Sequence, residues 1–171
     1  MTDVVFFNPV KSYAKTGVEL PMSLMALSSA IKQKGYSVKL IDFAIDDNAK
    51  KEALKFIDDA ICFGITCMTG PPIYHGLEMA RKVKDERPEL PLIWGGFHPS
   101  MLPEQTIRHP LVDIVVRGQG EETIIELVNT IKKGLPLKKV LGITYKENGG
   151  IISTPQRPMK DVNKFPMLDY T

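Results

Sequence analysis

The sequence predicts an α/β fold built on a doubly wound, five-stranded parallel sheet of the flavodoxin-like or Rossmann-like kind. Five short apolar runs alternate with segments of helical periodicity, which is typical of βαβ units. Most of these runs are continuously apolar, as strands are when helices cover both faces of a parallel sheet. A chain of 171 residues is also too short for an eight-stranded barrel, which needs about 250.

The first two strands are expected at residues 4–7 and 36–43. The first is an aromatic and β-branched run. The second alternates apolar and polar residues, as a strand with one partly wet side does. A helix over 20–34 joins them, and a polar helical stretch over 46–59 returns the chain. The joining helix is supported by four apolar residues on one helical face: Leu20, Leu24, Leu27 and Ile31.

The next two strands are expected at 61–67 and 90–94. Both are continuous runs of the kind found in buried strands. A helix is expected between them, beginning near Pro71 and Pro72, since proline is favoured in the first helical turn. A short helix is expected after Ser100.

The fifth strand is expected at 112–116, followed by a helix within 118–133 that Gly134 ends. The pattern then changes to a β-hairpin, with strands at 142–146 and 151–154 around the turn sequence Glu147-Asn148-Gly149-Gly150. The proline-containing remainder is expected to be extended.

Composition and charge exclude several classes of protein. Lys and Arg exceed Asp and Glu by only two, which excludes a nucleic-acid binder driven by bulk charge. No apolar run approaches the roughly 18 residues of a membrane span, and Asp3 stands where a secretory signal would be basic, so we expect a cytoplasmic protein. The cysteines, Cys62 and Cys67, are too few for a disulfide framework or an iron–sulfur site.

Ligands of open parallel sheets bind beyond the carboxyl ends of the strands. The residues expected there are rich in glycine and hydroxyl groups and poor in acids and bases, so no catalytic residue is predicted. They suit close approach of a large ligand: Asn8-Pro9, Asp42, Thr66 to Gly70, Gly95 to Ser100 and Arg117 to Glu122.

Three features at these strand ends remain open to two interpretations each. Gly95-Gly96 is either a tight turn or room for a flat ligand. The stretch from Gly118 resembles half of a phosphate cradle, but Glu121 and Glu122 would repel an anion there. Cys67 is a nucleophile if a base approaches it and otherwise a buried core residue.

The histidines do not predict a metal site. His75, His98 and His109 have no ligand partner at a helical or turn spacing, and His98 fits a loop-fixing hydrogen bond equally well. A flavin or nucleotide site of the flavodoxin kind is the main alternative function, and it would stack on aromatic residues at the strand ends. The candidates are Phe97, Tyr13 and Tyr74.

Four blocks in register resemble the N-terminal cobalamin-binding domain of cobalamin-dependent radical S-adenosylmethionine (SAM) enzymes. The resemblance covers about residues 3–169. The blocks are Phe63 to Gly70, Pro91 to Ser100 with Pro103-Glu104-Gln105-Thr106, Asp113 to Glu122, and Gly142-Ile143-Thr144-Tyr145.

This resemblance implies a cobalamin site at the carboxyl ends of the strands, with the loop from Tyr13 to Pro21 near the corrin edge. The Asp-x-His-x-x-Gly motif that ligates cobalt in methionine synthase-like domains is absent, which implies that no histidine of this kind coordinates cobalt. The implied cofactor-binding residues are Gly17, Leu20, Pro21, Thr66, Met68, Thr69, Gly70, Gly95, Gly96, His98, Pro99, Gly118, Gln119, Gly120 and Glu121.

The resemblance also divides the chain into a cobalamin-binding domain (1–135), an appended hairpin (136–155) and a linker (156–171) toward a missing radical SAM domain in cis. The Cys-x-x-x-Cys-x-x-Cys triad of that domain is absent, so a 4Fe-4S cluster and SAM are expected only in a full-length enzyme. The implied function is methyl transfer to an unactivated carbon by that enzyme, with a corrinoid as partner and neither nucleic acid nor membrane.

Overall fold

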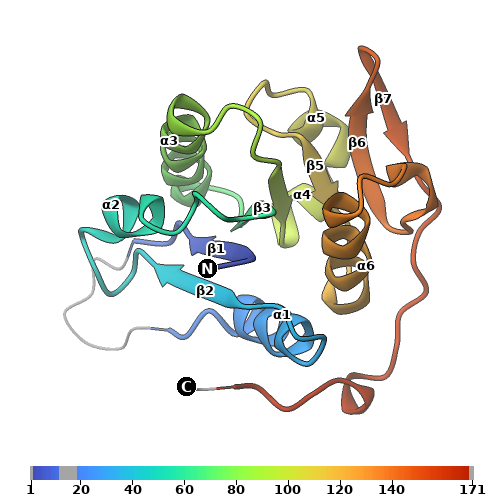
Figure 1. Cartoon of the computed structure of the whole chain (residues 1–171), viewed down its shortest axis with the longest axis horizontal. Coiled ribbons are helices and arrows are strands. Elements are labelled where there is room, and N and C mark those ends of the chain that lie inside the picture. Colours follow the sequence, from blue (N-terminus) through green and yellow to red (C-terminus); the bar gives the residue numbers. More distant parts are fainter. Residues whose placement is uncertain (1, 12–18, 170–171) are drawn as a thin grey trace.

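A single twisted sheet with helices on both faces organises the chain (Figure 1). The computed structural model describes residues 2–11 and 19–169. The sheet has the order β2-β1-β3-β4-β5-β6-β7, and its first five strands run parallel. Those five strands are β1 (Val4–Asn8), β2 (Val38–Asp42), β3 (Cys62–Thr66), β4 (Leu92–Gly95) and β5 (Ile114–Val116). The predicted doubly wound, flavodoxin-like arrangement is confirmed.

The predicted hairpin is part of the same sheet, which therefore has seven strands where five were expected. Strand β6 (Ile143–Glu147) pairs antiparallel with β5, and β7 (Gly150–Ser153) pairs antiparallel with β6. Without the hairpin, β5 would be an edge strand with unpaired backbone groups, and β6 supplies their hydrogen-bond partners. The hairpin turn places Asn148 and Gly149 at φ of 51° and 77°, as a tight two-residue turn requires.

Two helical layers cover the sheet. On one face α1 packs beside α6, and the other face carries α2, α3 and α5 (Figure 1). Two short helices, separated at Pro103, occupy the region where one was expected after Ser100. The helices are α1 (Met22–Lys32), α2 (Ala49–Leu54), α3 (Pro71–Glu86), α4 (Phe97–Met101), α5 (Pro103–Ile107) and α6 (Glu121–Lys132), with 3-10 turns at Leu137–Lys139 and Val162–Lys164.

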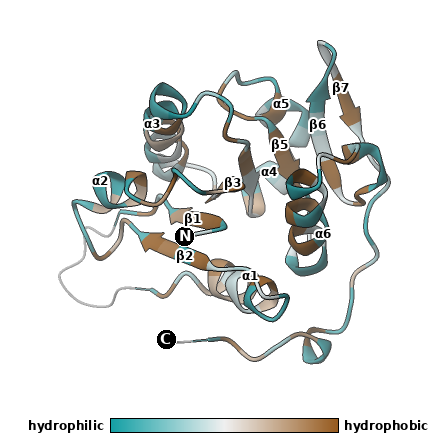
Figure 2. Cartoon of the chain, viewed as in Figure 1, coloured by the Kyte–Doolittle hydropathy of each residue, from teal (hydrophilic) through white to brown (hydrophobic). Residues whose placement is uncertain are grey.

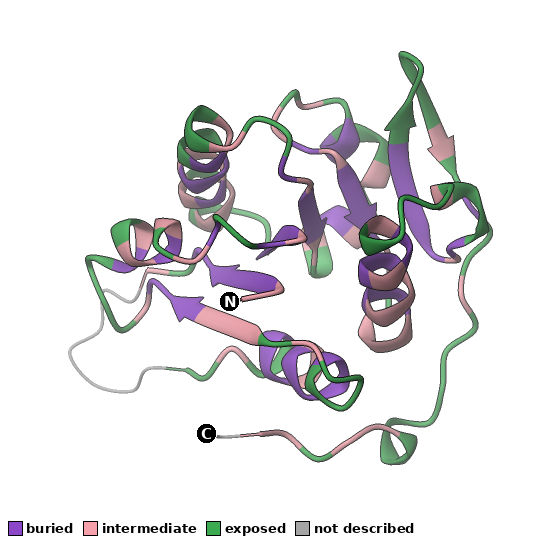
Figure 3. Ribbon diagram, viewed as in Figure 1, coloured by how far each residue is buried: buried purple, intermediate pink, exposed green. Residues whose placement is uncertain are grey.

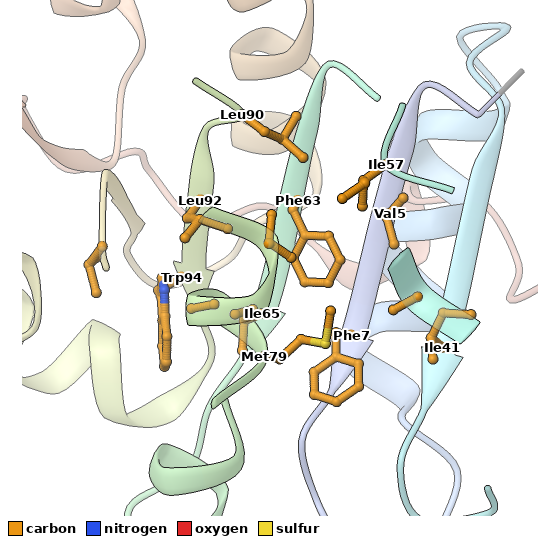
Figure 4. Packing of buried hydrophobic residues seen from close by; sticks show 14 of the residues in the cluster. Val5, Phe7, Ile41, Ile57, Phe63, Ile65, Met79, Leu90, Leu92 and Trp94 are labelled. Carbon is orange, nitrogen blue, oxygen red and sulfur yellow. The ribbon is translucent and has the colours of Figure 1, made fainter. Parts of the chain in front are cut away.

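Successive side chains of the central strands point to opposite faces of the sheet, and each face has its own hydrophobic core. Val5 and Phe7 of β1 pack under α2 and α3, in the cluster shown in Figure 4. Val4 and Phe6 of the same strand pack under α1 and α6. The apolar strands are brown in Figure 2, and the teal residues lie mainly on the outer helix surfaces and loops. This is why the strands read as continuous apolar runs in the sequence.

Burial falls toward both edges of the sheet. The first three residues of β2 are half-buried, on both faces of the strand, and the predicted alternation of a wet and a dry side is not seen there (Figure 3). At the other edge β7 is mostly exposed. None of the helices in the described part of the chain is long and apolar enough to span a membrane.

Helix α3 approaches the sheet closely at Gly76. A Cβ atom at this position would lie 2.9 Å from Trp94 Cη2 and 3.2 Å from Ile65 Cγ2. Both neighbours belong to the buried core, so neither has space to move away.

We therefore expect Gly76→Val to lower the free energy of unfolding by about 1–3 kcal/mol through overpacking. The control is Lys82→Val, which places the same β-branched residue at an exposed position of the same helix. Chemical denaturation of the two variants measures the difference. Equal stability of the two would show that α3 does not depend on this close contact.

Candidate functional site

A pocket opens between α1 and α6 at the carboxyl end of the sheet. It encloses about 180 Å³, and its walls are mainly apolar. The four parallel strands β1, β3, β4 and β5 contribute residues to it. It lies where open α/β sheets bind their ligands. The lining residues are Phe6, Ser23, Leu24, Leu27, Gly64, Ile65, Thr66, Ile93, Gly95, Gly96, Val116, Gly118, Gln119, Gly120, Glu121 and Ile124.

The pocket exists because two strands carry glycine on the side that faces α1 and α6. Gly64 lies in the middle of β3, and a Cβ there would come within 2.6 Å of the Phe6 ring. Gly95 ends β4 on the same side as Ile93, with open space around the position of its missing Cβ: the nearest atoms, of Val116, are 3.9 Å away. A side chain at Gly95 would project into the space between the sheet and the two helices, whereas one at Gly64 would collide with the Phe6 ring.

A turn of residues 117–120, which we call the pocket-lining turn, forms the second wall. The amide of Gly118 donates to Ser100 Oγ at 3.0 Å, which fixes the turn to α4. A Cβ at Gly120 would lie 3.1 Å from Leu27 Cδ2, so the turn packs directly against α1. Together with Glu121, the turn borders the pocket, and two of its residues, Gly118 and Gly120, carry no side chain.

The two glycines after β4 have different roles. Gly96 has a φ of +94°, and a Cβ there would lie 2.9 Å from the carbonyl oxygen of Cys67 and 3.0 Å from its amide nitrogen. The tight-turn interpretation therefore applies to Gly96, and the open space belongs to Gly95.

The structure brings seven of the predicted site residues to the pocket. These are Thr66, Gly95, Gly96, Gly118, Gln119, Gly120 and Glu121.

Gly17 lies outside the described residues, and the other predicted residues that the structure describes do not line the pocket. Leu20 and Pro21 immediately precede α1. The predicted residues that follow β3 and β4 lie beyond the ends of these strands. Met68 is 61% exposed, and His98 Nδ1 is 3.1 Å from Thr69 Oγ1. Gly70 and Pro99 are the chain neighbours of Thr69 and His98.

The sequence reasoning missed most of the apolar lining. Ser23, Leu24, Leu27 and Ile124 lie at helical positions that are typical of core residues, and nothing in their spacing separates a pocket wall from a packed interior. Gly64 did carry a signal, because a glycine within a buried strand often marks a close approach of another group.

Cys67 is a buried core residue and not a nucleophile. Its side chain is 1% exposed and donates to the carbonyl oxygen of Met68 at 3.3 Å, and burial raises the pKa of the thiol to about 12. The His98 ring contacts Thr69 instead. These contacts remove the basis for a cysteine hydrolase.

Most of the charge near the pocket is paired outside it. Glu122 and Glu126 of α6 form ion pairs with Arg157 and Lys160, which come from the segment after the hairpin. Across residues 2–11 and 19–169, no three His, Cys, Asp or Glu side chains converge as a metal site would require.

A family model described as the B12 binding domain matches residues 16–128. An uncharacterized methyltransferase of Pyrococcus horikoshii is 36% identical over 154 residues, which are 88% of this chain and 33% of that protein. The anaerobic magnesium-protoporphyrin IX monomethyl ester cyclase of Rubrivivax gelatinosus is 26% identical over 178 residues, covering 94% of this chain and 31% of the cyclase. The chain thus spans about a third of the length of these curated relatives.

The fold is also that of a solved radical SAM methyltransferase. TsrM from Kitasatospora setae, in a structure with cobalamin and a 4Fe-4S cluster bound, superposes with a TM-score of 0.77 at 19% identity. The match covers 97% of this chain and 31% of TsrM.

The variants Gly96→Val and Gly95→Val should distinguish the glycine that the turn requires from the glycine that faces the pocket. At Gly96 a β-branched side chain meets both a positive φ and the Cys67 backbone, so we expect a loss of about 2 kcal/mol or more in the free energy of unfolding. At Gly95 we expect a change below about 1 kcal/mol, because valine suits a strand and the space is open. Thermal or chemical unfolding measures both, and equal losses would contradict this division of roles.

The Cys67 thiol should react with iodoacetamide far more slowly than a free cysteine. At pH 8, well below the raised pKa of about 12, the thiol is protonated, and the thiolate is the reactive form. Mass spectrometry of the folded protein, with the denatured protein as control, gives the rate at each cysteine. Rapid modification of folded Cys67 would restore the nucleophile interpretation.

Proposed function

Because the chain belongs to the B12-binding domain family, we propose that the α1–α6 pocket receives the nucleotide tail of cobalamin while the corrin ring lies across the carboxyl ends of the strands. The observation that carries this proposal is the apolar, glycine-lined pocket itself. At about 180 Å³ it is too small for a whole cofactor, since pockets for drug-sized ligands measure about 300–1,000 Å³. It matches a part of one, such as a flat aromatic base.

The residues present fit such a base. Phe6, Ile93, Val116, Leu24 and Ile124 provide apolar surfaces on which the ring can be buried. Gly95 leaves open the space that a Cβ would occupy, and the absence of a Cβ at Gly64 lets the Phe6 ring pack directly against β3. The dimethylbenzimidazole of cobalamin is flat and largely apolar, so its burial here removes apolar surface from water.

The groups beyond the strand ends are suited to the corrin ring and its amide side chains. Met68 and Phe97 are 61% and 64% exposed at this edge, and they offer apolar contact to a flat macrocycle. Thr69 and His98 carry polar atoms that amide groups can bond. When bound, cobalamin supplies a cobalt centre that carries a methyl group, and these residues hold and orient it.

A flavin or nucleotide is a weaker candidate for the same site. Among the described residues lining the pocket, the only aromatic one is Phe6. Tyr74, at 65% exposure, meets the ring of His75 in its own helix edge to face. The α6 N-terminus, where a phosphate would bind, already carries Glu121 and Glu122. Tyr13 lies outside the described residues.

We extend the proposal to a longer enzyme in which a radical SAM domain follows in cis and holds a 4Fe-4S cluster and SAM. Methyl transfer to an unactivated carbon is favoured over cyclisation, because the methyltransferase relative is 36% identical and the cyclase 26%. Two buried, free cysteines fit a reducing cytoplasm, where such a cluster is maintained.

Cobalamin binding tests the proposal directly. We expect purified protein mixed with hydroxocobalamin and then desalted to retain the corrinoid absorbance. Gly95→Val should weaken this binding by about tenfold or more, since its side chain occupies the pocket. Lys82→Val, on the outer side of α3, is the matched control and should bind as the wild type does.

His98→Ala should leave the visible spectrum of bound cobalamin unchanged, because cobalt is not expected to be ligated by this histidine. A wild-type protein that emerges without corrinoid at high micromolar concentration would overturn the proposed function. Equal binding by Gly95→Val and the wild type would place the tail elsewhere.

A further inference from the structure

The segment that follows the hairpin is attached to the wall of the α1–α6 pocket. Its first part, residues 156–160, which we call the C-terminal segment, has no helix or strand of its own. It runs beside α6 after leaving β7, and the chain continues toward α1 (Figure 1). There the amide of Asp169 donates to Ser29 Oγ at 2.8 Å, so residues 156–169 contact both helices that enclose the pocket.

Gln119 of the pocket-lining turn uses both ends of its side-chain amide on this segment. Its Nε2 donates to the carbonyl oxygen of Lys160 at 3.1 Å, and its Oε1 accepts from the Lys160 amide at 2.7 Å. The pairing is like that of a β-ladder, with a glutamine side chain in place of one strand. A side chain held at both ends has a fixed rotamer, so the backbone to which it belongs is also fixed.

Further contacts join the same two stretches of chain. Gln156 Nε2 donates to the carbonyl oxygen of Arg117 at 3.4 Å, and a Cβ at Gly118 would lie 2.9 Å from that nitrogen. Arg157 Nε donates to Thr123 Oγ1 at 2.8 Å in the first turn of α6. Lys160 Nζ pairs with Glu122 in the same turn. The pocket-lining turn thus lies between α1 on one side and the C-terminal segment on the other.

We infer that Gln119 is a positioning residue: through its paired hydrogen bonds to Lys160, the C-terminal segment holds the pocket-lining turn in the conformation that accepts the nucleotide tail. This rests on the proposed function. Gln119 is not itself a ligand for the cofactor, because both functional atoms of its side chain are engaged by the Lys160 main chain. The turn itself has no helix or strand to hold it between Arg117 and Gly120, so its shape depends on contacts from outside, of which the bonds to Lys160 and the bond of the Gly118 amide to Ser100 are two kinds.

The test compares cobalamin with cobinamide, the corrinoid that lacks the nucleotide tail. Gln119→Leu keeps the side-chain size and removes both hydrogen bonds. We expect its Kd for cobalamin to rise about three- to tenfold, the range of one or two net hydrogen bonds, with an unchanged Kd for cobinamide. Gln119→Glu can still accept from the Lys160 amide but cannot donate, so an intermediate loss is expected. Gln105→Leu, an exposed glutamine of α5, is the matched control.

A second pair of variants changes Lys160, the partner of Gln119 in these hydrogen bonds. Lys160→Pro removes the amide that Gln119 accepts from, whereas Lys160→Ala keeps it and removes only the ion pair with Glu122. We expect Lys160→Pro to reproduce the selective loss of cobalamin affinity and Lys160→Ala to show a smaller one. Thermal unfolding shows whether each variant is folded at the assay temperature.

The outcomes are distinguishable. A wild-type protein that binds neither corrinoid overturns the proposed function. A wild-type protein that binds cobalamin, together with Gln119→Leu and Lys160→Pro variants that bind both corrinoids as it does, overturns the positioning role alone. Equal weakening of cobalamin and cobinamide also overturns it, because a loss unrelated to the tail reflects general loosening of the fold.

Discussion

The unequal filling of the two faces of the sheet determines the rest of this structure. Under α2 and α3 the core is closed by large side chains such as Phe63, Trp94 and Met79, all nearly inaccessible to solvent. Under α1 and α6 the carboxyl end of the core holds the pocket, where Gly95 of β4 has open space in place of a side chain. The two faces share the same strands, so β3 and β4 carry large side chains on one side and glycine on the other. That constraint places a pocket at one end of an otherwise packed domain.

The same constraint explains why the chemistry of the domain is sparse. The site proposed here, for part of a large, preformed cofactor, needs shape, apolar surface and exclusion of water more than acids or bases. The one thiol near the site is inert because it belongs to the filled face, where burial raises its pKa. Most of the charges close to the pocket neutralise one another on the outer surface of α6.

Much of the fold could be predicted from the sequence, because parallel strands buried on both faces leave an unmistakable apolar run. The hairpin followed from Asn148-Gly149, whose backbone does take positive φ. That β6 would extend the sheet was not predictable, since pairing with β5 depends on a spatial neighbour and not on local pattern. Of the site, the glycine-rich strand ends were identified. The roles of Gly95 and Gly96 could not be divided, because the difference lies in a backbone angle that glycine permits but does not require.

The hydrogen bonds between Gln119 and Lys160 span 41 residues of sequence, and the pocket they border is lined from Phe6 to Ile124. In terms of protein synthesis, the pocket is therefore one of the last features of the domain to be completed. Strands β1, β3 and β4 can pair early, and helix α6 closes the second wall only after most of the domain has been made. Until residue 160 has emerged from the ribosome, the turn at the pocket mouth lacks its outer contacts. The wall of the pocket is therefore completed only when the C-terminal segment has been made.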